Sequence, residues 1–145
     1  MFEVPMNKFI DTQNELVVVG DEINWNSLEN NFKAYYSNRG RPAVPVRKIV
    51  GLLILKTRFQ LSDEKVLNIW LENPYWQYFC GEVHFQKEKP FSSGEFSRFK
   101  RRVGGDGMDQ IQYLSAEHFG EGENGTYKNY TFLKTRSFWQ RLFNN

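Results

Sequence analysis

The chain has 145 residues, the length of one ordinary domain, and a second independently folded domain is not expected. Its 19 Lys and Arg residues against 17 Asp and Glu give a formal net charge of only +2, which does not mark a polycationic nucleic-acid coat protein. A single cysteine, Cys80, excludes an intramolecular disulfide, and two histidines leave no zinc-finger spacing. The N-terminus lacks a signal-peptide pattern, and the longest strongly apolar run, 49–55, is too short to span a membrane, so we expect a cytoplasmic protein without a membrane partner.

The first third of the chain predicts one ambiguous segment, one helix and one connector. Residues 15–19 are compatible with a strand or a helix, because short apolar runs do not discriminate. A helix with polar caps at Asn24 is predicted to end near Asn38, since four residues share one apolar face: Leu28, Phe32, Tyr35 and Tyr36. Residues 39–45 contain two prolines and are predicted to be extended, with Pro45 in the first turn of the next helix.

The middle of the chain predicts a central helix followed by two shorter ones. Residues 46–59 are apolar on nearly every side, which is typical of a helix surrounded by others, and Gly51 is expected to permit close packing. Residues 61–64 predict a turn and a helix N-cap, and the helix that follows them is predicted to end at Asn73. An aromatic helix over 75–80 is closed by a glycine and followed by a loop to residue 90.

Residues 92–103 predict a helix with two unlike faces. Residues 92–95 have the capping-box pattern. At about 100° per residue, Phe96, Phe99 and Val103 fall on one side, and Arg98, Arg101 and Arg102 fall on the opposite side. The glycine-rich stretch 104–107 is expected to break this helix before a last core helix over 108–118. We therefore expect a mainly α fold, a small multi-helix bundle with a helix-turn-helix-like basic helix over 1–118, and an irregular tail over 119–145.

Charge is segregated along the chain. Residues 1–38 carry 2 basic and 6 acidic residues, whereas 39–60 carry 6 basic residues and no acidic ones. A second basic island, 91–103, has 4 basic residues and 1 acidic residue within an otherwise mildly acidic chain. Because solvated surfaces usually intersperse both signs, such islands suggest a polyanionic partner.

The two basic islands favour recognition of double-stranded DNA. An arginine face on a short helix suits the major groove, because guanidinium groups match phosphate oxygens and the guanine edge. Arg39-Gly40-Arg41-Pro42 resembles the core of the minor-groove motif called the AT-hook, and a plain interhelical linker is the alternative. The alternative for the arginine helix is a solvated face. The predicted DNA-binding residues are Arg39, Arg41, Arg47, Lys48, Ser97, Arg98, Lys100, Arg101 and Arg102.

No pattern in the sequence predicts catalysis. His84 and His118 lack partners at the spacing of a catalytic or metal site and are interpreted as surface histidines. Cys80 lies in an aromatic run without a basic neighbour, which favours a buried structural thiol. We therefore assign no catalytic residue, metal ligand or cofactor.

Four motifs in order resemble the N-terminal domain of bacterial insertion-sequence transposases of the InsH type. The motifs are 41–56, 61–64, 72–81 and 97–104, and the most specific is Glu-Asn-Pro-Tyr-Trp-Gln-Tyr-Phe-Cys-Gly at 72–81. The upstream Asn24-Trp25 also fits, so the resemblance covers about residues 20–114. It implies a helical domain that binds the terminal inverted repeats of a mobile element, followed by a ribonuclease-H-like domain that holds metal with three carboxylates.

The C-terminal residues depart from that family. Residues 120–145 do not resemble its continuation, and the chain has no room for the catalytic domain after residue 118. We expect a non-catalytic fragment whose gene was truncated, with an out-of-frame tail. The alternatives are a protein-interaction module that pairs with full-length transposase or with itself, and a fragment without function. An interaction helix over 137–143 is the alternative for the tail.

Overall fold

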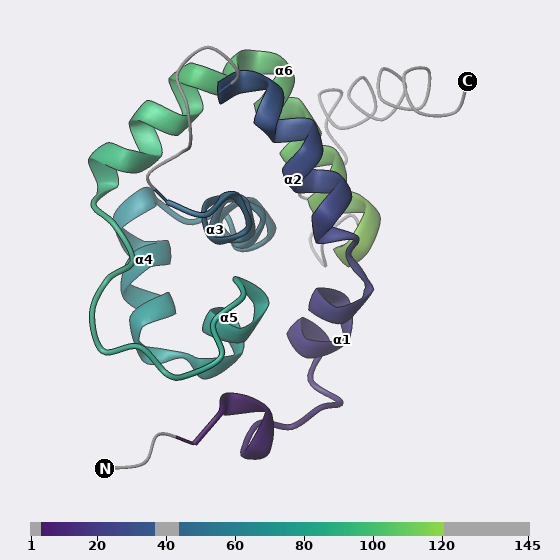
Figure 1. Ribbon diagram of the computed structural model, residues 1–145, viewed down its shortest axis with the longest axis vertical. Helices are drawn as coiled ribbons and strands as arrows, with labels where there is room; N and C mark the ends of the chain where they lie inside the picture. The colour runs from purple at the N-terminus through teal and green to yellow at the C-terminus, as the bar shows by residue number, and fades with distance from the viewer. Residues whose placement is uncertain (1–3, 37–43, 121–145) are drawn as a thin grey trace.

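The computed structural model describes residues 4–36 and 44–120, which form helices joined by turns and loops, with no strand among them (Figure 1). The mainly α prediction is confirmed. Within these two ranges, no helix combines the length and apolar character that a membrane crossing requires. The elements are η1 Met6–Lys8, α1 Glu15–Glu22, α2 Trp25–Lys33, η2 Ala34–Tyr36, α3 Val46–Phe59, α4 Asp63–Glu72, α5 Pro74–Phe79 and α6 Ser93–Phe119.

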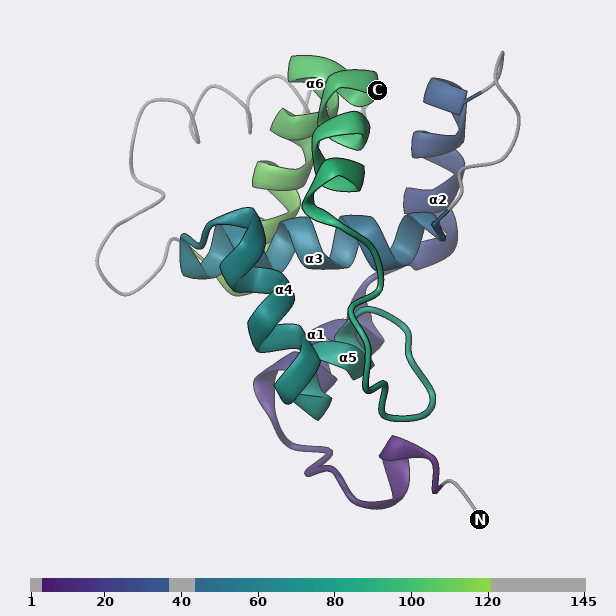
Figure 2. The same cartoon turned by 90° about the vertical axis from the view of Figure 1, so that its left-hand side faces the viewer.

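Helix α3 is the centre of the fold. Figure 1 looks along its axis, with α4, α5, α2 and α6 around it, and Figure 2 shows it crossing the middle of the molecule beneath α6. Val50, Leu52, Ile54 and Leu55 have no exposed surface, and every residue from Ile49 to Leu55 is buried. The apolar pattern on all sides of 46–59 therefore correctly predicted a helix enclosed by its neighbours.

The ambiguous segment 15–19 is helical because it is capped and packed on one side only. The Asn14 side chain accepts a hydrogen bond from the Leu16 amide at 2.8 Å. Leu16, Val17 and Val19 are buried, whereas Val18 is 40% exposed, which is a helical rather than an alternating pattern. The predicted cap of α2 is confirmed in the same way, since the Asn24 side chain accepts from the Ser27 amide at 3.1 Å.

A three-residue turn joins α3 to α4, as predicted. Gln60 takes the left-handed conformation at φ 56° and ends α3, and the Ser62 hydroxyl accepts from the Lys65 amide to cap α4. Pro45 lies at the N-cap of α3, one position before the predicted first turn. Gly51 permits the close packing predicted for it, because a β-carbon there would lie 3.0 Å from the Cys80 sulfur.

Helix α6 consists of two helical segments that meet at a kink, so the predicted break in the glycine-rich stretch is confirmed. The predicted break is confined to Gly104, at φ 67° and ψ −168°, and the residues from 105 onward continue as helix. We call 93–103 the first limb and 105–119 the second limb; the ribbon turns sharply between them (Figure 2). The predicted capping box is wrong, because the Ser92 side chain makes no cap hydrogen bond and the Glu95 carboxylate instead pairs with Arg98.

Two predicted segments fall largely outside the described residues. The connector with Arg39 and Arg41 lies within 37–43, and the tail lies outside them from residue 121 onward. Phe119, which the sequence analysis placed in the tail, is the last residue of α6, and its ring lies 5.9 Å from that of Phe79. The folded part of the chain thus includes at least this residue of the predicted tail.

Candidate nucleic-acid interface

The first limb of α6 is anchored to the rest of the fold by one apolar side. Phe96 is completely buried, and Phe99 and Val103 are 3% exposed. The Phe96 ring meets Phe91 edge to face at 4.9 Å, and the Phe99 ring lies 5.9 Å from Phe32 of α2. These contacts fix which side of the helix faces solvent, as the sequence spacing predicted.

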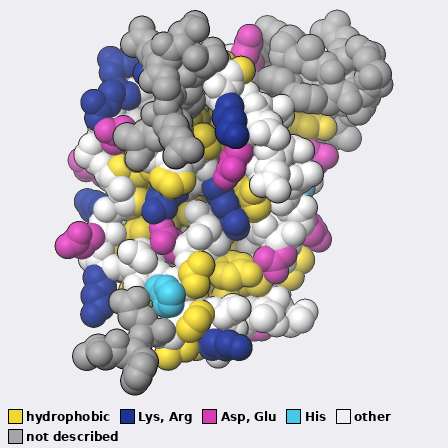
Figure 3. Space-filling model, in the orientation of Figure 1, with side chains coloured by type: hydrophobic (Ala, Val, Ile, Leu, Met, Phe, Trp, Pro, Cys, Tyr) yellow, Lys and Arg dark blue, Asp and Glu magenta, His cyan; other side chains and the backbone are white. Residues whose placement is uncertain are grey.

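The opposite side of this limb carries the arginine face, which we define as Arg98, Arg101 and Arg102. All three residues are exposed, and the Arg98 side chain retains 63% of its accessible surface although it pairs with Glu95. No ion pair joins Arg101 to any residue of the described ranges. Figure 3 shows Lys and Arg side chains gathered at the upper left, over this limb. The structure therefore presents guanidinium groups together on one rigid element.

Two other predicted residues of this limb are engaged within the protein. The Ser97 hydroxyl donates to the Ser93 carbonyl at 3.4 Å while its residue remains exposed. The Lys100 ammonium donates to Asp63 Oδ2 at 2.8 Å and is 30% exposed. Lys100 is thus turned toward α4 and away from the arginine face.

Arg47, predicted to contact DNA, lies half-buried between α2 and α5. Its guanidinium carbon stands 4.6 Å from the centre of the Trp25 ring, and one of its nitrogens donates to the Phe79 carbonyl at 3.4 Å. Burial lowers the pKa of the guanidinium, although the Cys80 thiol and nearby acidic groups oppose that shift. A β-carbon at Gly81 would lie 2.9 Å from Arg47 Cδ, so the glycine makes room for this side chain.

Lys48 also has an internal partner. It forms an ion pair with Glu82 of the loop after α5, and its side chain is 24% exposed. Of the first basic island, Arg47 and Lys48 hold α3 to the α5 region, whereas Arg39 and Arg41 fall outside the described residues.

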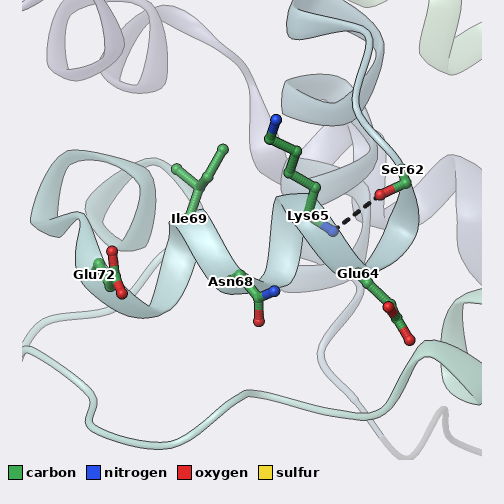
Figure 4. A pocket seen from close by; sticks show the side chains of 6 residues that line it. All are labelled: Ser62, Glu64, Lys65, Asn68, Ile69 and Glu72. Atoms are coloured by element: carbon green, nitrogen blue, oxygen red, sulfur yellow. Dashed lines mark hydrogen bonds between the residues drawn. The ribbon is translucent and has the colours of Figure 1, made fainter.

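The helix that follows the short turn is not the basic one. Helix α4 comes three residues after α3, whereas α6 follows a loop of more than ten residues. Figure 4 shows a shallow depression along α4. The acids Glu64 and Glu72 lie toward its two ends, and Lys65, Asn68 and Ile69 lie between these acids. Acidic side chains repel phosphate, so the basic first limb of α6 is a stronger candidate than α4 for a polyanion-binding surface.

Cys80 is buried, as the sequence predicted. Cys80 is 2% exposed, and burial raises the pKa of its thiol. Among residues 4–36 and 44–120, no three His, Cys, Asp or Glu side chains gather as metal ligands do. The residue that sequence reasoning missed is Asp63, whose spacing to Lys100, 37 positions along the chain, carries no local signal.

Comparison with known proteins places the chain in a family. A family model described as "Transposase domain (DUF772)" matches residues 4–102. The chain is 36% identical over 117 residues to "Uncharacterized protein ORF8 in nfe locus" of Rhizobium meliloti; the match covers 81% of this chain and 56% of that protein. The chain thus spans little more than half the length of this relative, and no solved structure matches it significantly. Because the family model covers more than half of the sequence and ends with the arginine face, the chain belongs to the DUF772 family of transposase domains.

Proposed function

We propose that the chain is a DNA-binding module of a transposase and that it recognises the terminal inverted repeats of a mobile element. The observation that carries the proposal is the exposed arginine face of α6, held on a limb whose other side is locked into the core. A rigid helix loses little freedom on binding, and guanidinium forks match the guanine edge and the phosphate oxygens. Membership in a transposase family supports the same conclusion.

In this proposal the residues divide by role. Arg98 and Arg101 read base edges, Arg102 and Ser97 contact phosphates beside them, and Arg39 and Arg41 reach the backbone or the minor groove from the connector. Arg47 and Lys48 support the fold, because each already has a partner inside it.

The proposal includes no chemistry by the chain itself. The described residues offer no cluster of acidic side chains for the divalent metal that DNA strand transfer uses in related transposases, so we assign binding and not cleavage to them. Incubation of the chain with end-labelled repeat DNA and Mg²⁺ is expected to leave the strands intact, and specific nicking at the repeat end would contradict this assignment.

The test is a binding titration of the full chain, at several salt concentrations, against two duplexes. One duplex is copied from the ends of the element that encodes the chain, and the other is a scrambled sequence of the same composition. Tighter binding to the repeat, with affinity that falls steeply as salt rises, is expected. Equal weak binding to both duplexes would reduce the arginine face to a solvated surface.

A pair of double variants tests the assignment to residues. Arg98→Ala with Arg101→Ala should weaken repeat binding by about 1–3 kcal/mol for each base-reading arginine and should abolish the preference over the scrambled duplex. Lys8→Ala with Lys87→Ala is the matched control, because it removes the same charge from exposed side chains outside α6. An arginine variant that behaves like this control would contradict the role of the arginine face.

A second candidate function is pairing with full-length transposase or with another copy. Exposed apolar side chains favour it: Val4 and Val83 are 55% and 60% exposed, and their segments are joined by the Met6 amide, which donates to the Val83 carbonyl at 2.8 Å. Size-exclusion chromatography without DNA separates the candidates, since only the pairing function predicts co-elution with the intact enzyme.

A further inference from the structure

One carboxylate, that of Asp63, joins three helices beside the arginine face. Asp63 begins α4, and its Oδ2 accepts from Lys100 of α6 at 2.8 Å. Its other oxygen lies 3.6 Å from the ammonium of Lys56, in the last turn of α3. All three side chains are largely covered, with exposures of 21% for Asp63, 28% for Lys56 and 30% for Lys100. One acid thus pairs with two lysines, one from α3 and one from α6.

Lys100 lies on the first limb between its buried side and the arginine face. At about 100° per residue, its position is about 40° from Phe96 and about 100° from Arg101, the nearest of the three arginines. A duplex that rests on the arginine face brings one phosphate backbone toward this side of the limb. A lysine at this position is well placed to reach a phosphate, but here its ammonium is hydrogen-bonded to a carboxylate.

An internal carboxylate changes what a lysine contributes to DNA binding. A phosphate contact stabilises the complex largely by releasing condensed counterions, and each one adds about 0.9 to the slope of log affinity against log salt. A lysine that must first leave a carboxylate contributes less of this sequence-independent attraction. Phosphate contacts add affinity for every sequence, whereas base contacts discriminate between sequences.

We propose that Asp63 is a specificity-determining residue, which holds Lys100, and to a smaller extent Lys56, away from the phosphate backbone and so limits binding to non-target DNA. This inference rests on the proposed function and defines how that interface is regulated. The carboxylate competes with phosphate for the same ammonium groups. The arginines of α6 then account for a larger share of the free energy of DNA binding. Lys100 is therefore not a DNA contact in the wild-type protein.

The test is the salt dependence of binding by Asp63→Asn, which keeps the shape of the side chain and removes its charge. The salt slope should become steeper by about 0.9 for each lysine released. Affinity for the scrambled duplex should rise more than affinity for the repeat, so that the specificity ratio falls. A folded Asp63→Asn protein with the wild-type slope and ratio would overturn the proposal. Circular dichroism at 222 nm establishes that the variant is folded.

Lys100→Gln provides a second test, and its measurement in the wild-type background does not depend on the folding of Asp63→Asn. In the wild-type background it should leave the salt slope unchanged, and in the Asp63→Asn background it should remove about 0.9 of the added slope. A slope that becomes shallower on Lys100→Gln in the wild-type background would overturn the proposal, because Lys100 would then already contact phosphate.

The arginine double variant separates this inference from the proposed function. If the wild-type chain prefers the repeat, and Arg98→Ala with Arg101→Ala removes that preference, the proposed function stands whatever the Asp63 variant does. A wild-type chain that binds neither duplex would overturn both.

Discussion

Two adjacent glycines at the bend of α6 should respond in opposite directions to the same substitution. Gly104 has φ 67° and ψ −168°, a region that only glycine occupies readily, whereas Gly105 is helical and exposed. Apart from the adjacent residues and the backbone of the helix itself, no atom lies within 4 Å of a β-carbon placed at either position, so clashes with other parts of the fold do not contribute. The difference between the two sites is therefore one of backbone conformation alone.

The expected magnitudes follow from that difference. Gly104→Ala should lower the free energy of unfolding by about 1–3 kcal/mol, the cost of forcing a side chain into this conformation. Gly105→Ala should raise it by about 0.4–1 kcal/mol, because alanine restricts the unfolded chain and the native conformation accepts it. The two variants should thus differ by roughly 1.5–4 kcal/mol, which is large against a typical total stability of about 5–15 kcal/mol.

Urea unfolding followed by circular dichroism and tryptophan fluorescence measures both effects. Equal m-values would show that the midpoints report stability rather than a changed unfolded state. If Gly104→Ala were as stable as the wild type, or if both variants shifted in the same direction, the bend would not require a glycine at this position. Packing alone would then determine the direction of the first limb.

Three further substitutions test the core by the same unfolding assay, and one of them tests how the Cys80 thiol makes stability depend on pH. Phe96→Ala should cost about 3–5 kcal/mol, because the ring is completely buried beneath the arginine face; a cost below 1 kcal/mol would contradict its anchoring role. Gly51→Val should cost about 1–3 kcal/mol through overpacking against Cys80, and a neutral result would show that α3 and α5 can separate freely. Burial raises the pKa of the Cys80 thiol above its ordinary 9.0, so the folded state holds the proton more tightly than the unfolded state. The thiol's contribution to stability should be complete below pH 9 and should decrease as the pH rises above it, and a Cys80→Ala variant should lose less stability over that range.

Local patterns were sufficient to predict most of the helices. The bounds of α3 follow from an apolar run between Pro45 and the turn at 60–62, and the N-caps at Asn24 and Ser62 each have the expected side-chain hydrogen bond. The two faces of the first limb of α6 were also correct, because helical spacing determines which residues share a side. Glycine composition alone did not locate the bend, since only Gly104 of that stretch leaves the helical conformation.

The interface was less predictable, because charge partners depend on tertiary contacts. Arg47 belongs to a basic island in the sequence, but the fold places it over Trp25, and Lys48 meets Glu82 of a loop. Lys100 and Asp63 are 37 positions apart and meet only because α6 packs beside the α3–α4 turn. A count of basic residues therefore overestimates the charge that the described surface can offer to DNA.

The central position of α3 also has a consequence for how the chain folds as it is made. Its apolar surface is covered in part by the second limb of α6, where Phe119 lies 5.8 Å from the Arg58 guanidinium carbon. About 50 residues separate the two segments, which takes roughly 3–10 s at a synthesis rate of about 5–20 residues per second. During that interval the central helix of the fold lacks part of its cover. Ribosome-associated chaperones should therefore associate most strongly with nascent chains in which α3 has emerged from the ribosome and the second limb of α6 has not.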